Sequence, residues 1–201
     1  MSMRKLQALS IVFAAASEYQ KNLVNKSLLF VCVDKRKKTY CVEVTFDKSN
    51  FKHLTGFKTD INASQFFDLC INRRLKENDF EFSDDGTTSL KLQVLPRLVR
   101  SNLSVNMIGD YNMSQPKLYT EKIAGNVFAC IGFTRTGPSG RLVPNTVLEG
   151  DIRKNAKRPD RIILTYRKNR GESEYTELVY KAKKVDWTNI SIPEPYSNLL
   201  K

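Results

Sequence analysis

The chain contains a single histidine, His53, in the segment Asn-Phe-Lys-His-Leu-Thr-Gly-Phe at residues 50–57. A hydroxyl group, on Thr55, and Gly56 follow it directly. Imidazole is the side chain whose charge changes near neutral pH, so it can accept or donate a proton. The alternating pattern of residues 28–46 predicts that His53 stands where a strand ends. This placement favours acid–base chemistry on a phosphate-bearing substrate; the alternative is a turn in which the histidine packs or caps.

The familiar hydrolase motifs are missing from the sequence. There is no GxGxxG, P-loop, GxSxG or HExxH motif, and the carboxylate pair Asp84-Asp85 falls in a predicted exposed turn. One histidine cannot complete a zinc site with cysteines that lack CxxC spacing. These cysteines stand among apolar neighbours, at Cys32, Cys41, Cys70 and Cys130. We therefore expect no metal or other cofactor, and buried reduced thiols of a cytoplasmic protein.

Metal-independent cleavage of RNA fits what remains. That reaction needs a base for the 2′-hydroxyl, an acid for the leaving 5′-oxygen and cations beside the phosphorane. His53 can take one proton-transfer role, and a tyrosine, lysine or carboxylate must take the other. Guanidinium groups bind phosphate oxygens in pairs. Residues that could form such a clamp lie among turns and strand ends, at Arg141, Arg153 and Arg161, and tyrosines that could stack on bases or donate a proton are Tyr111, Tyr166, Tyr175 and Tyr180.

The positive charge of the chain is concentrated. The net charge is +12, and residues 134–170 hold ten lysines and arginines against three acidic residues. Such a basic block indicates a polyanionic partner, nucleic acid before a membrane, because no basic amphipathic helix with an aromatic face accompanies it. The alternative is a solvated surface that keeps the protein soluble.

The first half of the chain has helical and hairpin patterns. Apolar residues recur at helical spacing over 3–24, 63–75 and 89–99, and Asn62 is suited to cap the second of these helices. Residues 28–46 predict a hairpin whose turn centres on Arg36-Lys37. That register would place Cys32 opposite Cys41.

The second half of the sequence has residue patterns typical of β-strands. Residues rich in β-branched and aromatic side chains occur at 105–111, 126–135, 161–167 and 175–183. The fold class predicted is α+β, with N-terminal helices and a β-hairpin followed by an antiparallel sheet of about four strands. We expect one domain over residues 1–201, with a core at about 5–183 and a C-terminal tail at 184–201.

The order of several short motifs resembles the phage-associated branch of the barnase–EndoU–colicin–RelE-like (BECR) nuclease superfamily. The resemblance spans roughly residues 5–183. Its matching pieces are Asn50-Phe-Lys-His-Leu-Thr-Gly56 after the hairpin, Phe66-Phe67, Ile108-Gly-Asp-Tyr111, Gly125, Pro144-Asn-Thr-Val-Leu, Asp151-Ile-Arg153, Arg161-Ile-Ile and Tyr175-Thr-Glu-Leu-Val-Tyr-Lys-Ala-Lys. Each piece is weak alone, and the ordered set carries the resemblance.

The resemblance implies a metal-independent ribonuclease of toxin or phage-conflict type, in the cytoplasm of a bacterial or phage-infected cell. His53 would be the general acid or base, Arg153 the phosphate clamp and Thr55 the group that orients the phosphate. Tyr175 would stack or donate a proton, and the residue that acts as the proton-transfer partner of His53 stays open. The residues expected to bind the RNA or its phosphates are Lys52, Arg141, Asp151, Arg161 and Lys181. An antitoxin or a host nuclease complex could be a protein partner.

Two other readings remain open at this stage. The same scaffold could be a non-catalytic phage protein that binds nucleic acid, or mimics it, to inhibit a host defence nuclease. It would then show salt-sensitive binding without a product. The second possibility is a structural component of a virion, with the His53 segment as a packing device.

Overall fold

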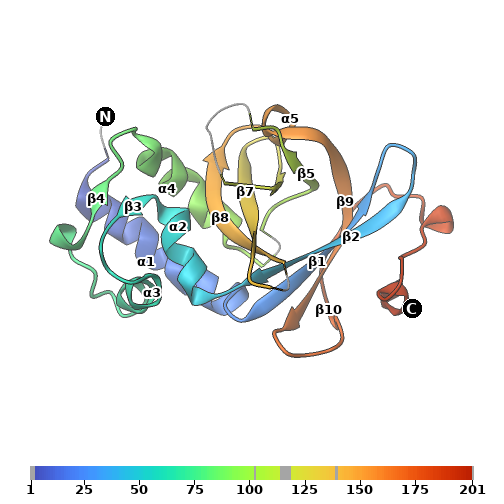
Figure 1. Cartoon of the computed structure of the whole chain (residues 1–201), viewed down its shortest axis with the longest axis horizontal. Coiled ribbons are helices and arrows are strands. Elements are labelled where there is room, and N and C mark those ends of the chain that lie inside the picture. Colours follow the sequence, from blue (N-terminus) through green and yellow to red (C-terminus); the bar gives the residue numbers. More distant parts are fainter. Residues whose placement is uncertain (1–2, 102, 114–118, 139, 201) are drawn as a thin grey trace.

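The computed structural model describes residues 3–101, 103–113, 119–138 and 140–200. Figure 1 shows helices gathered at one end of the molecule and a closed β-structure at the other. The helices are α1 (Lys5–Asn22), α2 (Phe51–Thr55), α3 (Ala63–Ile71) and α4 (Thr87–Leu98), with the short helix α5 (Ile152–Asn155) apart from them, at the top of the barrel in Figure 1. The predicted N-terminal helices and the α+β class are confirmed.

Seven strands form a closed mixed barrel. They are β1 (Lys26–Val33), β2 (Thr39–Phe46), β5 (Met107–Tyr111), β6 (Lys122–Gly125), β7 (Ala129–Thr136), β8 (Arg141–Glu149) and β9 (Ala156–Asn169). The order is β1-β2-β8-β7-β6-β5-β9, and β9 pairs again with β1. β2 and β8 run parallel, joined at Val44 and Leu142. An eighth strand, β10 (Glu177–Lys181), extends the sheet beside β9, and β3 (Phe57–Lys58) and β4 (Glu81–Phe82) form a separate pair.

The predicted antiparallel sheet of about four strands is therefore wrong. The prediction missed β6 and β8, and it shortened β9, which extends over 14 residues and reaches β1, β5 and β10. Pro144 lies inside β8, at a shift in its register with β7, where a strand tolerates proline. Closure depends on pairing between segments more than a hundred residues apart, which local alternation does not reveal.

The β1–β2 hairpin forms, but its register differs from the prediction by one residue. Cys32 lies opposite Tyr40, and Cys41 lies opposite Val31. The Asp34 carboxylate accepts hydrogen bonds of 2.8 Å from the backbone amides at positions 36 and 38, which fixes the loop. All four cysteines are free, and burial raises the pKa of their thiols, to about 11 for Cys41.

The segment with the histidine also differs from its prediction. β2 ends at Phe46, a turn of 3₁₀-helix follows, and His53 lies in the short helix α2 rather than at a strand exit. By contrast, Asn62 caps α3 as predicted, because its side chain accepts a hydrogen bond of 3.0 Å from the amide of Ser64. α4 continues through Pro96.

The main core lies between the helices and the barrel. Tyr19 of α1 is fully buried there, and its ring lies 5.2 Å from that of Phe51 and 5.8 Å from that of Phe67. These aromatic contacts attach α2 and α3 to α1, and Phe46 at the end of β2 joins the same group. The core therefore holds the histidine-bearing helix α2 against both α1 and the barrel.

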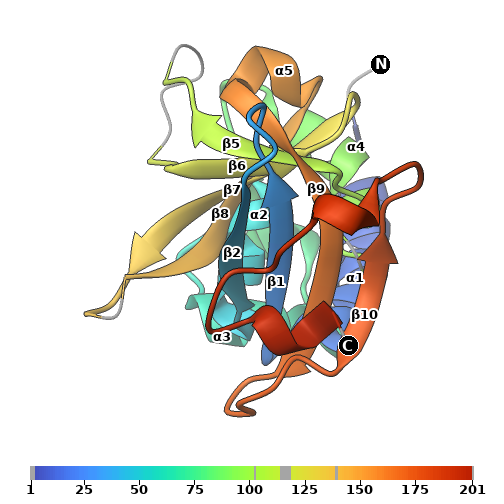
Figure 2. The ribbon, with the colours of Figure 1, turned by 90° about the vertical axis from the view of Figure 1, so that its right-hand side faces the viewer.

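The C-terminal tail packs on the outer face of β1 and β9 (Figure 2). Ile192 is buried against this face, and the hydroxyl of Tyr166 on β9 donates a 2.6 Å hydrogen bond to the carbonyl oxygen of Leu199. The strand β1 is consequently buried on both faces. Among the described residues, no helix has both the length and the apolar character needed to cross a membrane.

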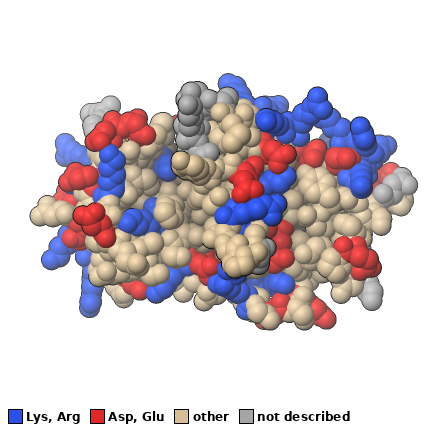
Figure 3. Space-filling model, viewed as in Figure 1, with Lys and Arg blue, Asp and Glu red and all other residues tan. Residues whose placement is uncertain are grey.

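The basic block at residues 134–170 is spread over β7, β8, α5 and β9. Four of its arginines pair with carboxylates, namely Arg135 with Glu121, Arg153 with Asp151, Arg167 with Glu177 and Arg170 with Asp47. Figure 3 shows lysine and arginine side chains gathered over the tip of the β1–β2 hairpin, whose residues 35–38 are all basic and exposed. The positive surface is thus assembled from segments outside the block as well as within it.

Candidate functional site

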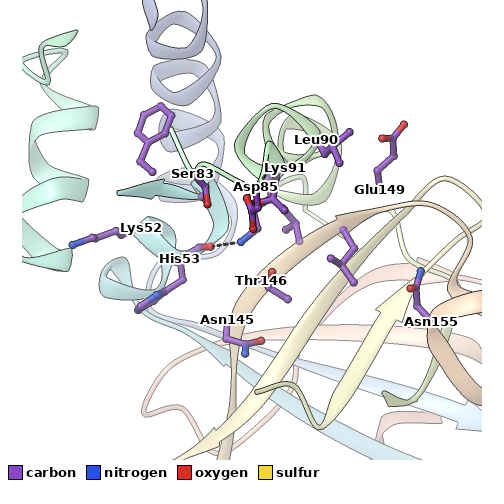
Figure 4. A pocket seen from close by; sticks show the side chains of 15 residues that line it. Lys52, His53, Ser83, Asp85, Leu90, Lys91, Asn145, Thr146, Glu149 and Asn155 are labelled. Carbon is purple, nitrogen blue, oxygen red and sulfur yellow. Dashed lines mark hydrogen bonds between the residues drawn. The ribbon is translucent and has the colours of Figure 1, made fainter. Parts of the chain in front are cut away.

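A cleft of about 760 Å³ separates α2 and α4 from strand β8 of the barrel (Figure 4). Its lining combines one imidazole, two lysines, two carboxylates and several hydroxyl and amide groups. These polar residues are Lys52, His53, Ser83, Asp85, Thr87, Lys91, Asn145, Thr146, Glu149 and Asn155. A cleft where an imidazole and a lysine meet polar side chains from an opposite element is a candidate active site.

His53 lies on the rim of this cleft, in the middle of α2. Its ring is exposed and is turned away from Lys91, while its backbone carbonyl oxygen faces into the cleft (Figure 4). Loss of hydration lowers the pKa of His53 below its usual 6.5, and the positive charges of Lys52 and Lys91 lower it further. The imidazole is therefore neutral at neutral pH and can accept a proton.

Lys91 of α4 is the cation inside the cleft. Its Nζ donates a hydrogen bond of 3.4 Å to the backbone oxygen of His53. Burial lowers the pKa of Lys91, and the nearby negative charge of Asp85 partly opposes this shift. Hydrogen bonds from Thr87 hold the pKa of Asp85 down, at about 2, so its carboxylate is ionised. The cleft thus contains a partly desolvated ammonium group, whose positive charge is stabilised by the ionised carboxylate of Asp85.

The residues that follow His53 build this arrangement. The buried hydroxyl of Thr55 donates to the carbonyl oxygen of Lys52 at 2.8 Å and accepts from the amide of Phe57 at 3.2 Å. Gly56 ends α2 in the left-handed conformation, with φ of +73°. Its carbonyl oxygen accepts a 2.8 Å hydrogen bond from Thr88, at the start of α4. The Thr55-Gly56 pair therefore terminates one helix and attaches it to the next.

Gly56 also leaves room for Lys91. A β-carbon at position 56 would lie 2.9 Å from Cδ of Lys91 and 3.3 Å from Cα of Thr88. The lysine stem can thus pass directly over the glycine to reach the carbonyl oxygen of His53. This contact explains in physical terms why glycine suits position 56.

Strand β8 supplies the opposite wall. Thr146 is buried, and its hydroxyl has no hydrogen-bond partner among the described residues. A buried hydroxyl without a partner is costly unless a ligand satisfies it. The neighbouring Asn145 is held by its amide group, which donates to the backbone oxygen of Tyr119 at 2.7 Å and accepts from Thr120 at 3.2 Å. Because the oxygen itself has no exposed surface, a molecule bound in the cleft can reach the Thr146 hydroxyl only if neighbouring side chains move.

The other predicted site residues lie elsewhere or are occupied. Lys52 lines the cleft, but its Nζ donates to the carbonyl oxygens of Thr59 and Ile61, both at 2.7 Å. Asp151 caps α5 and pairs with exposed Arg153 at 2.5 Å, which lowers the pKa of the Asp151 carboxyl group. α5 adjoins the cleft through Asn155 rather than through this ion pair.

Tyr175 is buried under the C-terminal tail. Its hydroxyl lies near Glu43 without a hydrogen bond of good geometry, and burial, followed by the charge of Glu43, raises its pKa. The ammonium group of Lys168 lies 4.4 Å from the centre of its ring. His53 lies in α2 on the rim of the cleft, Arg153 lies in α5, and Tyr175 lies before β10 under the tail, so the three residues do not converge. Figure 1 shows α2, α5 and β10 apart from one another.

The remaining predicted phosphate contacts lie on the barrel. Lys181 of β10 places its ammonium group 4.9 Å from the ring centre of Trp187, in the tail. Exposed Arg161 donates to the backbone oxygens of Lys183, at 2.5 Å, and Lys184, at 3.4 Å. Arg141 is exposed at the start of β8 and lines a hollow beside β2. None of these three lines the cleft of His53.

Sequence reasoning did not single out Lys91, Asp85 or Thr146 as site residues. Lys91 stands between Leu90 and Leu92 in a predicted helix, where a lysine is normally solvated. The sequence predicts Asp85 in an exposed turn, and the structure confirms this placement, but the turn borders the cleft. The sequence signal for Thr146 was its place in the Pro144-Asn-Thr-Val-Leu motif, which carried no assigned role.

Comparison with known proteins identifies a family but no individual relative. Neither a curated protein nor a solved structure gives a significant match to the chain. In the described part of the chain, no group of three or more His, Cys, Asp or Glu side chains could hold a metal ion. The family model described as phage-Barnase-EndoU-ColicinE5/D-RelE like nuclease 4 matches residues 11–184. The match confirms the resemblance inferred from the ordered motifs, and the chain belongs to this family of phage-associated nucleases.

Proposed function

We propose that the protein is a metal-independent ribonuclease of phage-conflict type that cleaves RNA in the cleft between α2, α4 and β8. The observation that carries the proposal is the half-buried ammonium group of Lys91, held beside the only histidine and facing a wall with an unsatisfied threonine hydroxyl. Membership of a nuclease family supports cleavage of nucleic acid as the type of reaction. The cleft contains an imidazole and an ammonium group, which suit proton transfer and phosphate binding.

The neutral imidazole of His53 takes the proton from the ribose 2′-hydroxyl in the proposed reaction. The 2′-oxygen then forms a bond to phosphorus, and the bond from phosphorus to the 5′-oxygen breaks. The ammonium group of Lys91 stabilises the negative charge on the phosphorane and gives a proton to the departing 5′-oxygen, which its lowered pKa favours. The products are a 2′,3′-cyclic phosphate and a 5′-hydroxyl, and both side chains recover their protonation states from water.

The geometry of His53 requires one adjustment for this role. Its ring is turned away from Lys91 (Figure 4), but it is exposed, and exposed side chains change rotamer on a picosecond to nanosecond timescale. Rotation of the imidazole toward the cleft would allow His53 and the ammonium group of Lys91 to contact the same phosphodiester group. A shift of the side chains that cover Thr146 would let its buried hydroxyl donate a hydrogen bond to that group from β8.

An RNA cleavage assay in excess EDTA tests the proposal. We expect the parent protein to cleave, and His53→Ala to be folded but inactive, because the base is missing. His53→Gln provides a second variant of more similar size. Full cleavage by both variants would remove His53 from the mechanism, and loss of parent activity in EDTA would contradict metal independence.

A second function is favoured by the separation of His53, Arg153 and Tyr175. Because these residues do not converge, the protein could be a non-catalytic phage inhibitor that occupies a host nuclease complex. This alternative gives salt-dependent binding of nucleic acid or of a protein partner at a fixed stoichiometry, with no cleavage under any condition. The same assay separates the two functions, since only the first yields a cyclic phosphate product.

A further inference from the structure

Three connected hollows lie at the hairpin end of the barrel, away from the cleft of His53. The first lies between the β1–β2 loop and the tail, the second over β5, β6 and β9, and the third between β2 and β8, with volumes of about 440, 330 and 520 Å³. Lys35 and Asp160 line both the first and the second hollow, and Tyr40 and Lys122 line both the second and the third. Figure 2 shows the hairpin tip beside β5 and β9. The hollows share no lining residue with the cleft.

The middle hollow depends on a strained and specific backbone. Arg158 has a φ of +45°, in the left-handed region that an arginine in a strand rarely adopts. The register of β5 and β9 shifts at this point, and Gly109 faces the bulge. A β-carbon at Gly109 would lie 3.1 Å from three atoms of residues 156, 157 and 159. Bulges with backbone strain re-aim side chains and are frequent at functional sites.

The acidic groups of the middle hollow are already engaged. Asp160 accepts a 2.7 Å hydrogen bond from the hydroxyl of Tyr40, and Asp110 pairs with Lys122 at 2.6 Å. Among the described residues, no carboxylate forms an ion pair with Lys35, Lys157 or Arg158, which line the same hollow. Cations that repel one another without a partner mark a surface suited to an anion.

The neighbouring hollows continue the positive surface. Carboxylates also line them, namely Asp34 and Asp186 in the first hollow, where both accept hydrogen bonds from backbone amides, and Glu43 in the third. The cations are Arg161 and Lys184 in the first hollow, and Arg141 and Arg135, which pairs with Glu121, in the third. Two of these four, Arg141 and Arg161, were predicted from the sequence to contact RNA phosphates. The cations follow one another across the end of the barrel, which suits a chain of phosphates better than a single anion.

We propose that these three hollows form a binding track for the phosphodiester backbone of single-stranded RNA, separate from the cleft where cleavage occurs. The cations Lys35, Lys157 and Arg158 line a recess of about 330 Å³ rather than a flat surface, so phosphates must follow a curved path into it, which a flexible single strand can do and a stiff duplex cannot. The inference rests on the proposed ribonuclease function, which it extends by giving the substrate a second place of attachment.

Arg158→Gly tests the track with a matched control. The substitution removes one cation and also relieves the left-handed strain, so the variant should fold at least as well as the parent. Arg73→Gly makes the same change outside the track, because Arg73 is exposed at the end of α3 with a φ of +54°. Binding is measured with a fluorescent single-stranded 2′-O-methyl RNA, which lacks the nucleophile and cannot be cleaved by the proposed reaction.

We expect Arg158→Gly to weaken binding about tenfold, the effect of one charge-assisted contact, and Arg73→Gly to bind like the parent. The slope of log affinity against log salt concentration should fall in magnitude by about 0.7 for Arg158→Gly only. Equal binding by the two variants, or no binding by the parent at low salt, would overturn the track. Displacement of the RNA by polyglutamate as readily as by unlabelled RNA would also overturn it, in favour of an acidic protein partner.

The binding assay also separates this inference from the proposed catalysis. A parent protein that binds the 2′-O-methyl RNA through Arg158, but leaves ordinary RNA intact, would support the track and contradict the ribonuclease. A parent protein that cleaves RNA, with Arg158→Gly binding as well as Arg73→Gly, would support the ribonuclease and contradict the track.

Discussion

The ammonium group of Lys91 lies 3.4 Å from the backbone oxygen of His53, so one hydrogen bond connects α4 to the helix that carries the only histidine. The contact depends on Gly56, whose missing side chain leaves space for the lysine stem. The segment around His53 thus has two effects: it presents an imidazole at the rim of a cleft and holds a cation inside it. Substitutions of His53, Lys91 and Gly56 distinguish the two effects.

Lys91→Met should abolish most cleavage without unfolding the protein. Methionine preserves the length of the stem over Gly56 but removes the charge proposed to stabilise the phosphorane, and loss of one such group costs about 10²–10³-fold in rate. Stability should be equal or higher, because burial lowers the pKa of Lys91 and the charged form is therefore the costly one. Steady-state cleavage and thermal unfolding measure the two effects. Lys21→Met, at an exposed position of α1, is the control, and full activity of Lys91→Met would contradict the role.

Gly56→Ala and Gly86→Ala form a matched pair. Both glycines are left-handed, with φ values of +73° and +74°, but a β-carbon at position 86 would meet no atom within 4 Å. Each substitution should cost about 1–2 kcal/mol of backbone strain. Gly56→Ala should cost more, and should also reduce cleavage, because the methyl group displaces Lys91. Urea unfolding and cleavage assays check this, and equal losses of stability and activity in the two variants would rule out the contact.

His53 should make the protein less stable in acid. Its pKa in the folded state is lowered below 6.5, so the unfolded chain binds more protons as the pH falls through this region. Stability should therefore be complete above about pH 6.5 and decrease as the pH falls toward the folded pKa. His53→Gln should lack this part of the pH dependence. Thermal unfolding of both proteins between pH 5 and 8 measures the difference, and parallel curves would contradict the shift.

Tyr175→Phe should retain cleavage and should not lose stability. The hydroxyl is buried and has no hydrogen-bond partner within the described part of the chain, so its removal should change the free energy of unfolding by zero to about +1 kcal/mol. Tyr166→Phe is the contrasting control, since that hydroxyl donates to the carbonyl oxygen of Leu199 and its loss should cost about 1 kcal/mol. Cleavage lost from a stable Tyr175→Phe protein would instead support the catalytic role first assigned to this tyrosine.

Ile192→Ala should show that the C-terminal tail is part of the folded unit. Ile192 is 4% exposed against the outer face of the barrel, and truncation of such a residue costs about 2–5 kcal/mol. Cleavage should be unaffected at temperatures where the variant is folded, because the tail does not line the cleft. Leu178→Ala, at an exposed position, should change stability by less than about 0.5 kcal/mol. Equal stability of the two variants would show that packing of the tail through Ile192 does not stabilise the folded protein.

Local sequence patterns predicted the helices well and the sheet poorly. The amphipathic spacing in α1, α3 and α4 and the cap at Asn62 depend on neighbouring residues, and these predictions are confirmed. Closure of the barrel depends on pairing of β1 with β9, which only the whole fold determines. The hairpin register was wrong although a local signal existed, because the Asp34 side chain binds the amides of its own loop.

The candidate site was only partly accessible to sequence reasoning. His53 could be named because it is the only histidine, and its neighbours Thr55 and Gly56 attract attention as a motif. The structure gives those two neighbours a positioning role, through hydrogen bonds and through space for Lys91. Lys91 itself could not be named, because its burial follows from the approach of α4 to α2 and β8, which the spacing of the leucines in α4 does not specify.

The most direct test of the proposed reaction uses oligodeoxynucleotides with a single ribonucleotide, one for each of the four bases, incubated with the protein in EDTA. Attack by a 2′-hydroxyl predicts cleavage only on the 3′ side of the ribonucleotide, a 2′,3′-cyclic phosphate at the new end detected by mass spectrometry, and no product with His53→Gln or Lys91→Met. Cleavage at deoxynucleotides, or a product with a 5′-phosphate, would contradict the account.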